Sequence, residues 1–353
     1  MTKHTRLFLF VSVGILVAGL GTGLVAAYVG GFQNLNFLGS SSRDELAYLP
    51  SDAKVVAFAN VREIMDSELH QKLRAMAPRN DNGMARFQEE TGVDVTRDVD
   101  YVLAAIGGEN AVAGPGQGHP LIIARGRFDT VRIEGLVRSK GGTVEDYKGV
   151  RLLTVAEPTG AMDAALAFVE PGLIAMGAQD AVRKAIDARQ GGASSAAGNE
   201  ELVRLVKEAD DGNAWVVARF DALSSAGQVP SEVLKRLPAI NWVTITGHVN
   251  GGVRAAVRAE TRDEAAGKNL RDVLQGMLAL AKLQTGSQAD VSALIDSVEL
   301  GGEGKNVSLG LSVPIEFIDR LASLRTAGGL PPPPDAPPAP EAPPAPEPPA
   351  TAP

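Results

Sequence analysis

The chain has 353 residues, with 42 acidic and 34 basic side chains, a formal net charge of −8 and no cysteine. The missing cysteines exclude disulfide frameworks, thiol nucleophiles, cysteine-ligated metal centres and a lipid anchor on an N-terminal cysteine. The acidic balance, with no basic run longer than two residues, argues against a nucleic-acid partner, because phosphate binding needs clustered Lys and Arg. The length is sufficient for one large domain or two ordinary ones.

An apolar run lies near the start of the chain. Residues 7–29, LFLFVSVGILVAGLGTGLVAAYV, carry no charged side chain and are numerous enough to cross a hydrocarbon core of about 30 Å. This predicts a transmembrane helix. Basic residues precede it and none follows until Arg43, which predicts a cytoplasmic stub at residues 1–6 and the bulk of the chain outside the membrane. The alternative is a cleaved signal peptide, which would release a secreted soluble form.

Two further segments have compositions that are atypical of a packed core. Residues 30–44 are rich in Gly, Ser and Asn, which predicts a flexible linker. Residues 326–353 contain 13 of the 22 prolines, all within Pro331–Pro353, which predicts a disordered or polyproline II tail. The tail is interpreted either as a spacer or as a docking strip for envelope proteins or the cell wall, because it contains P-x-x-P spacing.

Residues 45–190 predict a first α+β repeat. The β-rich run KVVAFANV leads into a segment whose apolar residues recur at helical spacing, which predicts a strand followed by an amphipathic helix. The segments that follow predict, in order, a second helix, strands at 101–106 and 120–128, a helix at 129–140, two hairpins and a helix at 178–189.

Residues 199–325 predict a second repeat, after a Gly- and Ser-rich linker at 191–198. NAWVVARFDAL is similar to the earlier AKVVAFANVREI, and Asn250-Gly251 between two β-rich runs predicts a tight hairpin. Residues 253–260 alternate apolar and polar, so one face is expected to pack and the other to be solvated. The expected fold class is α+β: two diverged repeats of strand-helix-hairpin-helix-hairpin-helix with mainly antiparallel sheets, preceded by one transmembrane helix.

Three short segments, YLPSDAKVVAFANVREIMDSELHQKL, TGVDVTRDVDYVLAAIG and EDYKGVRLLTV, carry a resemblance to known sequences. Over about Ala47 to Arg189 the chain resembles a group of uncharacterised bacterial envelope proteins with an N-terminal membrane or signal segment. The resemblance implies a bacterial envelope location, which together with the predicted membrane topology gives an inner-membrane anchor and a periplasmic bulk. It implies no catalytic or ligand-binding residue.

The histidines do not indicate a metal site. His70 shares a helix face with Asp66 and Glu63, but a charged, solvated face explains this spacing as well as a metal ion does. His119 is expected to end a loop, and His248 to take part in cross-strand hydrogen bonding. No metal ligand is predicted.

Four residues alternate in the way that calcium-loop ligands do: Asp94, Thr96, Asp98 and Asp100. The pattern then fails, because Val99 replaces the required glycine and Ala105 replaces the bidentate glutamate. We therefore expect Gly92 to end a helix, Asp94 to form an N-cap or turn, and a strand to begin near Asp100.

Other catalytic or cofactor motifs are incomplete. GPGQGH lacks the spacing of a dinucleotide loop, and Gly301–Lys305 lacks the flanking residues of a phosphate loop. Ser231 and Lys235 are four residues apart, whereas a Ser/Lys hydrolase dyad requires three. No cofactor and no catalytic residue is predicted.

The leading functional hypothesis is a non-enzymatic binding or scaffolding protein of the bacterial envelope. One alternative is a hydrolase or transferase with paired carboxylates, for which Glu89, Glu90, Asp98 and Asp100 are the candidates. A second alternative is an apolar-ligand or lipid carrier, which would require an empty apolar cavity.

Overall fold

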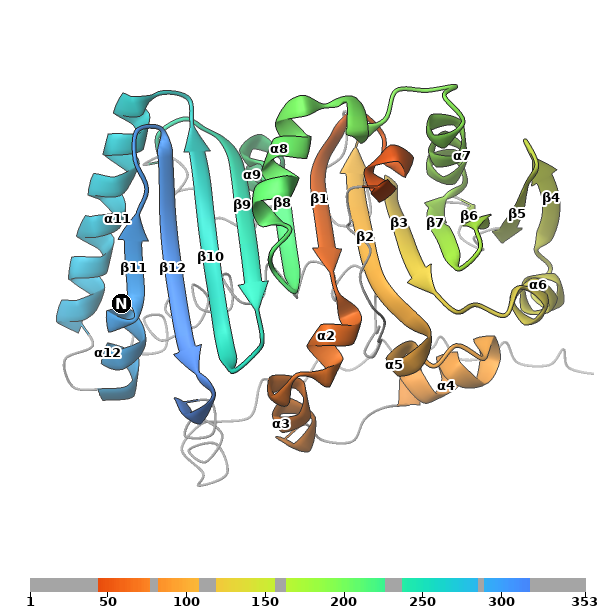
Figure 1. Cartoon of the computed structure of the whole chain (residues 1–353), viewed down its shortest axis with the longest axis horizontal. Helices are drawn as coiled ribbons and strands as arrows, with labels where there is room; N and C mark the ends of the chain where they lie inside the picture. Colours follow the sequence, from red (N-terminus) through yellow and green to blue (C-terminus); the bar gives the residue numbers. More distant parts are fainter. Residues whose placement is uncertain are drawn as a thin grey trace, which may run out of the picture.

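The strands of the chain form one large sheet. A computed structural model describes residues 44–76, 82–107, 119–155, 163–225, 237–284 and 289–317. The strands are β1 (Ala53–Ala59), β2 (Val99–Gly107), β3 (His119–Gly126), β4 (Thr143–Tyr147), β5 (Val150–Val155), β6 (Ala164–Glu170), β7 (Leu173–Ala178), β8 (Ala214–Arg219), β9 (Ile240–His248), β10 (Gly252–Thr261), β11 (Val298–Gly301) and β12 (Asn306–Pro314). They pair antiparallel in the order β11-β12-β10-β9-β8-β1-β2-β3-β7-β6-β5-β4 (Figure 1).

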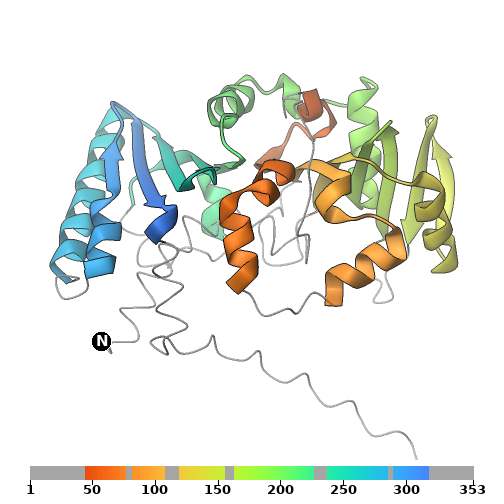
Figure 2. The same cartoon turned by 60° about the horizontal axis from the view of Figure 1, so that its bottom comes forward.

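Helices lie on both faces of this sheet. They are η1 (Asp44–Tyr48), α2 (Val61–Asp66), α3 (Glu68–Met76), α4 (Asn82–Thr91), α5 (Val95–Asp98), α6 (Thr130–Ser139), α7 (Gln179–Arg189), η2 (Ala196–Gly198), α8 (Glu200–Ala209), α9 (Phe220–Ser225), α11 (Glu264–Gln284) and α12 (Ala289–Asp296). The face covered by η1, α7 and α8 is called the front face below. It faces the reader in Figure 1 and points upward in Figure 2.

The predicted fold class is wrong, because the two halves of the chain do not form separate α+β repeats with sheets of their own. Strands β1 and β8, from the first and second half, pair with each other at the centre of one 12-stranded antiparallel sheet. Both strands are almost entirely buried, so each needs a covered neighbour on both edges. Pairing between strands about 160 residues apart leaves no local signal in the sequence, and the hydrophobic pattern alone could not show it.

The prediction of a transmembrane helix, and with it the inner-membrane and periplasmic location, is also corrected. No helix in the described part of the chain is long and apolar enough to cross a membrane. The predicted segment, residues 7–29, lies outside the described residues, as do residues 1–6, most of the predicted linker and the proline-rich tail. The function proposed below therefore uses neither a membrane anchor nor a location.

The two halves of the sheet follow similar paths from its centre. Val56 of β1 lies opposite Val217 of β8, in the segments whose sequences are similar. Each half then continues through a second and a third strand to the last strand of a hairpin: β1-β2-β3-β7 in one direction and β8-β9-β10-β12 in the other. Cross-strand partners can therefore be compared position by position between the halves.

The core is divided between the two faces. The largest buried cluster lies on the front face, where Val182, Ile186 and Leu202 of α7 and α8 pack against the sheet together with η1. On the other face, one cluster lies under α5 and α6 and another lies around Val216 and Val243 at the centre. On the front face, the strands of the first half are therefore covered by η1 and α7.

Candidate functional site

A pocket of about 250 Å³ lies on the front face of the second half, beside α8. Its wall on the α8 side is formed by Leu205 and Glu208, and its floor by residues of three adjacent strands. The strand residues are Trp242 and Thr244 of β9, Arg258, Ala259 and Glu260 of β10, and Asn306, Val307 and Ser308 of β12; Gly302 completes the lining. In Figure 1, α8 lies over β8 and β9, whereas no labelled helix lies in front of β10 and β12.

The pocket occupies a position that is filled with apolar side chains in the first half. Starting from Val56, the cross-strand partners are Ala105, Leu121 and Gly177. Starting from Val217, they are Thr244, Arg258 and Ser308. The second half therefore has an arginine where Leu121 is 1% exposed under α7.

The next row of partners shows the same change. In the first half Leu103, Ile123 and Ala175 are completely buried, and in the second half the corresponding residues are Trp242, Glu260 and Asn306. No helix of the described residues covers the polar row as α7 covers the first half, because β12 runs on to Pro314 before the chain turns helical at residues 315–317. The two halves therefore share strand order but differ in the chemistry of this face.

Glu260 is the buried charge of the pocket. Only 7% of this residue is exposed, and its two carboxylate oxygens accept hydrogen bonds from Lys305 Nζ at 2.6 Å and Arg204 Nη2 at 2.7 Å. Burial would raise the pKa of Glu260, but the bonds from Lys305 and Arg204 outweigh it and hold the pKa below its usual range. Glu260 is thus ionised and fully engaged at neutral pH.

Arg258 is the cation of the pocket that lacks a carboxylate partner. Its Nη1 donates to the backbone oxygen of Glu208 at 3.4 Å, and it forms no ion pair with any acid of the described residues. The Glu208 side chain is itself paired with Arg204 Nη1 at 2.9 Å. Thr244 and Ser308, which both carry hydroxyls, are the direct cross-strand neighbours of Arg258. The arrangement can accept an anionic group of a ligand.

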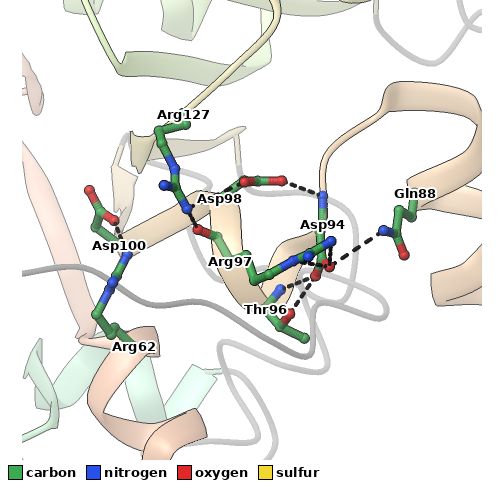
Figure 3. A network of polar contacts seen from close by, with 8 residues as sticks. All are labelled: Arg62, Gln88, Asp94, Thr96, Arg97, Asp98, Asp100 and Arg127. Atoms are coloured by element: carbon green, nitrogen blue, oxygen red, sulfur yellow. Dashed lines mark hydrogen bonds and ion pairs between the residues drawn. The ribbon is translucent and has the colours of Figure 1, made fainter.

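The acidic residues singled out in the sequence form a different network, at the start of β2 (Figure 3). Asp94 accepts hydrogen bonds from Thr96 N at 2.9 Å and Thr96 Oγ1 at 2.5 Å, which confirms the predicted N-cap, and Arg97 Nη2 lies 2.6 Å from Asp94 Oδ2. The predicted helix end at Gly92 is confirmed by its positive φ of 76°. Asp98 Oδ2 accepts a bond from Asp94 N at 2.8 Å. These oxygens are therefore used within the turn.

The four candidate carboxylates of the hydrolase hypothesis are not brought together as a pair. Asp98 lies 3.5 Å from Arg127 and Asp100 lies 3.1 Å from Arg62, and Figure 3 shows the two carboxylates directed toward these different arginines. Burial raises the pKa of Asp100, and this effect outweighs the charge of the nearby Arg62, which lowers the pKa. Glu90 pairs with Lys140 at 2.6 Å, and Glu89 is exposed.

The histidines are placed singly. His70 Nδ1 bonds to the Met65 carbonyl oxygen at 2.9 Å, and Glu63 accepts a bond from Asn213. Among the described residues no three His, Asp or Glu side chains are grouped as metal ligands would be. His248 Nε2 bonds to the Asp211 carbonyl oxygen at 3.0 Å instead of bonding across the sheet.

The remaining motifs have structural roles or lie outside the described residues. Gly301–Lys305 forms the turn between β11 and β12, with Gly302 and Gly304 at positive φ. The glycine-rich loop after β2 lies outside the described residues, as do Ser231 and Lys235. The structure describes the backbone of His119 at the start of β3 but not its side chain.

The pocket residues were not singled out from the sequence. The alternation of residues 253–260 did place Arg258 and Glu260 on one strand face, which is the signal that could have found them. That face was expected to be solvated, whereas Glu260 is buried, because Arg204 and Lys305 come from distant parts of the chain.

Comparison with known proteins gives no match: no family model, no curated protein and no solved structure is significantly similar to this chain. The resemblance stated from the sequence stays a prediction.

Proposed function

We propose that this chain is a non-enzymatic binding protein whose pocket at Arg258 takes an anionic group of its partner. The observation that carries the proposal is the contrast between the two halves at one sheet position. Buried Leu121 under α7 is replaced by Arg258, which is exposed and has no carboxylate partner among the described residues. An uncovered guanidinium beside a hollow and flanked by hydroxyls suits recognition of a carboxylate or similar anion.

Binding is favoured over acid–base catalysis by the state of the acids. A general acid or base works best with a pKa near the working pH, whereas two cations hold the pKa of Glu260 low. Each of the acids near β2 is ion-paired with a basic side chain, and this structural role accounts for them without catalysis.

An apolar-ligand carrier is less well supported. The pocket lining includes the charged residues Glu208, Arg258 and Glu260 and the amide of Asn306, with Leu205 and Trp242 as its larger apolar members. A carrier would have to bury its apolar ligand against the charged groups of Arg258 and Glu260, which costs desolvation free energy. The predicted role of the proline-rich tail as a docking strip stays a separate prediction, because the tail lies outside the described residues.

The test uses full-length protein and fluorescein-labelled hexapeptides of Glu, Lys or Ser, with binding followed by fluorescence anisotropy at low ionic strength. We expect only the Glu peptide to bind. Arg258→Gln should weaken it by about three- to tenfold, the range of an exposed to partly desolvated charged hydrogen bond. Lys184→Gln, an exposed residue on α7, is the matched control with the same charge change. Equal binding by the Arg258 and Lys184 variants would refute the proposal.

A further inference from the structure

Arg258 is one of two arginines that stand on the same uncovered strand face. Arg254 lies four residues earlier on β10, and pairing with β12 is continuous from Gly252 to Glu260, so both side chains project from the front face. Arg254 is exposed and, like Arg258, forms no ion pair with an acid of the described residues. Other arginines on this sheet have a carboxylate partner, as Arg125 and Arg151 do.

The surface between the two arginines is made of small side chains. Ala256 lies between them on β10, with Gly310 of β12 opposite on one side and Thr246 of β9 on the other. No helix among the described residues lies in front of this part of β10 and β12 (Figure 1). No described helix therefore stands in the way of a chain that lies along β10, from the pocket at Arg258 toward Arg254.

The spacing of the arginines sets the length of the ligand. A strand rises about 3.4 Å per residue, so the Cα atoms of Arg254 and Arg258 are separated by about 13 to 14 Å. A small molecule that fits a pocket of about 250 Å³ is poorly suited to reach both arginines. An extended polypeptide can reach both arginines. Its side chains four residues apart point to the same side and have the same separation as Arg254 and Arg258.

We infer that the front face of β10 binds an extended segment of a partner chain in which two acidic side chains are four residues apart, one at Arg258 and one at Arg254. This deepens the proposed function and rests on it. Each anion would also meet a neighbour that can donate a hydrogen bond, Ser308 beside Arg258 and Ser312 beside Arg254. Glu299 of β11, opposite Gly310, disfavours an acidic segment that strays toward the sheet edge.

The acidic residues of this chain's own tail are spaced differently. Asp335, Glu341 and Glu347 follow one another at intervals of six residues. At about 3.1 Å per residue in the polyproline II conformation that the sequence predicts, the interval is about 19 Å. A partner chain is therefore the better match for the two arginines.

The test compares three labelled peptides of Gly and Ser that carry two Glu residues at i and i+2, i and i+4, or i and i+8. All three spacings keep the acids on one side of an extended chain, and only the separation changes. With the full-length protein we expect the i+4 peptide to bind at least about threefold more tightly than the other two. Arg254→Gln and Arg258→Gln should each abolish this preference, and Glu299→Gln should tighten binding by about twofold.

The controls separate this inference from the proposed function. The pair Lys184→Gln and Lys268→Gln, both on exposed helix surfaces, should leave the preference intact. Equal binding of all three peptides that is still weakened by Arg258→Gln would overturn the spacing rule and leave the proposed function standing. No binding of any peptide would overturn both. If a chain ending at Gly329 bound the i+4 peptide several-fold more tightly, the tail would be the occupant and the assignment to a partner chain would be wrong.

Discussion

Trp215 is the side chain whose removal should most clearly show that the two halves share one sheet. It is completely buried on the front face of β8, lies opposite Phe58 of β1, and stacks on that ring with centroids 5.5 Å apart. A buried tryptophan removes about 200 Å² from water, which at about 25 cal/mol per Å² contributes about 5 kcal/mol. Alanine keeps part of this contribution, so we expect Trp215→Ala to lower the free energy of unfolding by about 3 to 5 kcal/mol.

A conservative variant sharpens this test. The Trp215 Nε1 atom is buried and has no hydrogen-bond partner among the described residues, so its burial is itself destabilising. Trp215→Phe removes that donor while keeping a ring against Phe58, and we expect it to cost less than about 2 kcal/mol.

The assay is equilibrium urea unfolding followed by two signals. In the Trp215 variants the one remaining tryptophan, Trp242, reports on the second half by fluorescence, while circular dichroism reports on all strands. Both signals should shift together, because β1 and β8 are adjacent strands of one sheet. A loss below about 1 kcal/mol for Trp215→Ala, or a shift of the fluorescence transition alone, would refute the reasoning.

Two further predictions concern the first half of the chain. Burial raises the pKa of Tyr48 to about 12, and the hydrogen bond that its hydroxyl donates to Glu170 at 2.7 Å adds to the effect. The folded state then holds a proton that the unfolded chain loses near pH 10, so this contribution to stability is complete below pH 10 and is lost between about pH 10 and 12. In urea unfolding across that range, the free energy of unfolding should fall more steeply with pH for the native protein than for Tyr48→Phe. Parallel curves would contradict the raised pKa of Tyr48. Asp94→Ala should lower the free energy of unfolding by about 1 kcal/mol through loss of the α5 N-cap. The comparison is Gln88→Ala, which keeps the cap and removes only the 3.4 Å hydrogen bond that Gln88 Nε2 donates to Asp94 Oδ2. An equal effect of the two variants would argue against the cap.

Local features of the fold could be predicted where the signal is local. Asn250-Gly251 does join β9 and β10 in register, and Gly92 and Asp94 do end one helix and cap the next, because a positive φ or a capping carboxylate is decided within a few residues. The pairing of β1 with β8 could not be predicted. Val56 and Val217 are equally suited to the centre of one sheet or of two, and only the folded chain shows which strand each one meets.

The candidate site was partly within reach of the sequence. The polar face of β10 is visible in the alternation of residues 253–260, and it does bear Arg254 and Arg258. The burial of Glu260 depends on Arg204 of α8 and Lys305 of the β11–β12 turn, which are 56 and 45 residues away. The pocket also depends on the absence of a covering helix at this position among the described residues, which only the comparison of the two halves reveals.

The partner is inferred to bind along the front face of β10. Hydrogen–deuterium exchange of the full-length protein, with and without the i+4 Glu peptide, locates the contact directly. We expect slower exchange over residues 240–260 and 306–314, with no change at β4 on the opposite edge of the sheet. Protection confined to the first half, or unchanged exchange over β10 while the peptide is bound, would contradict it.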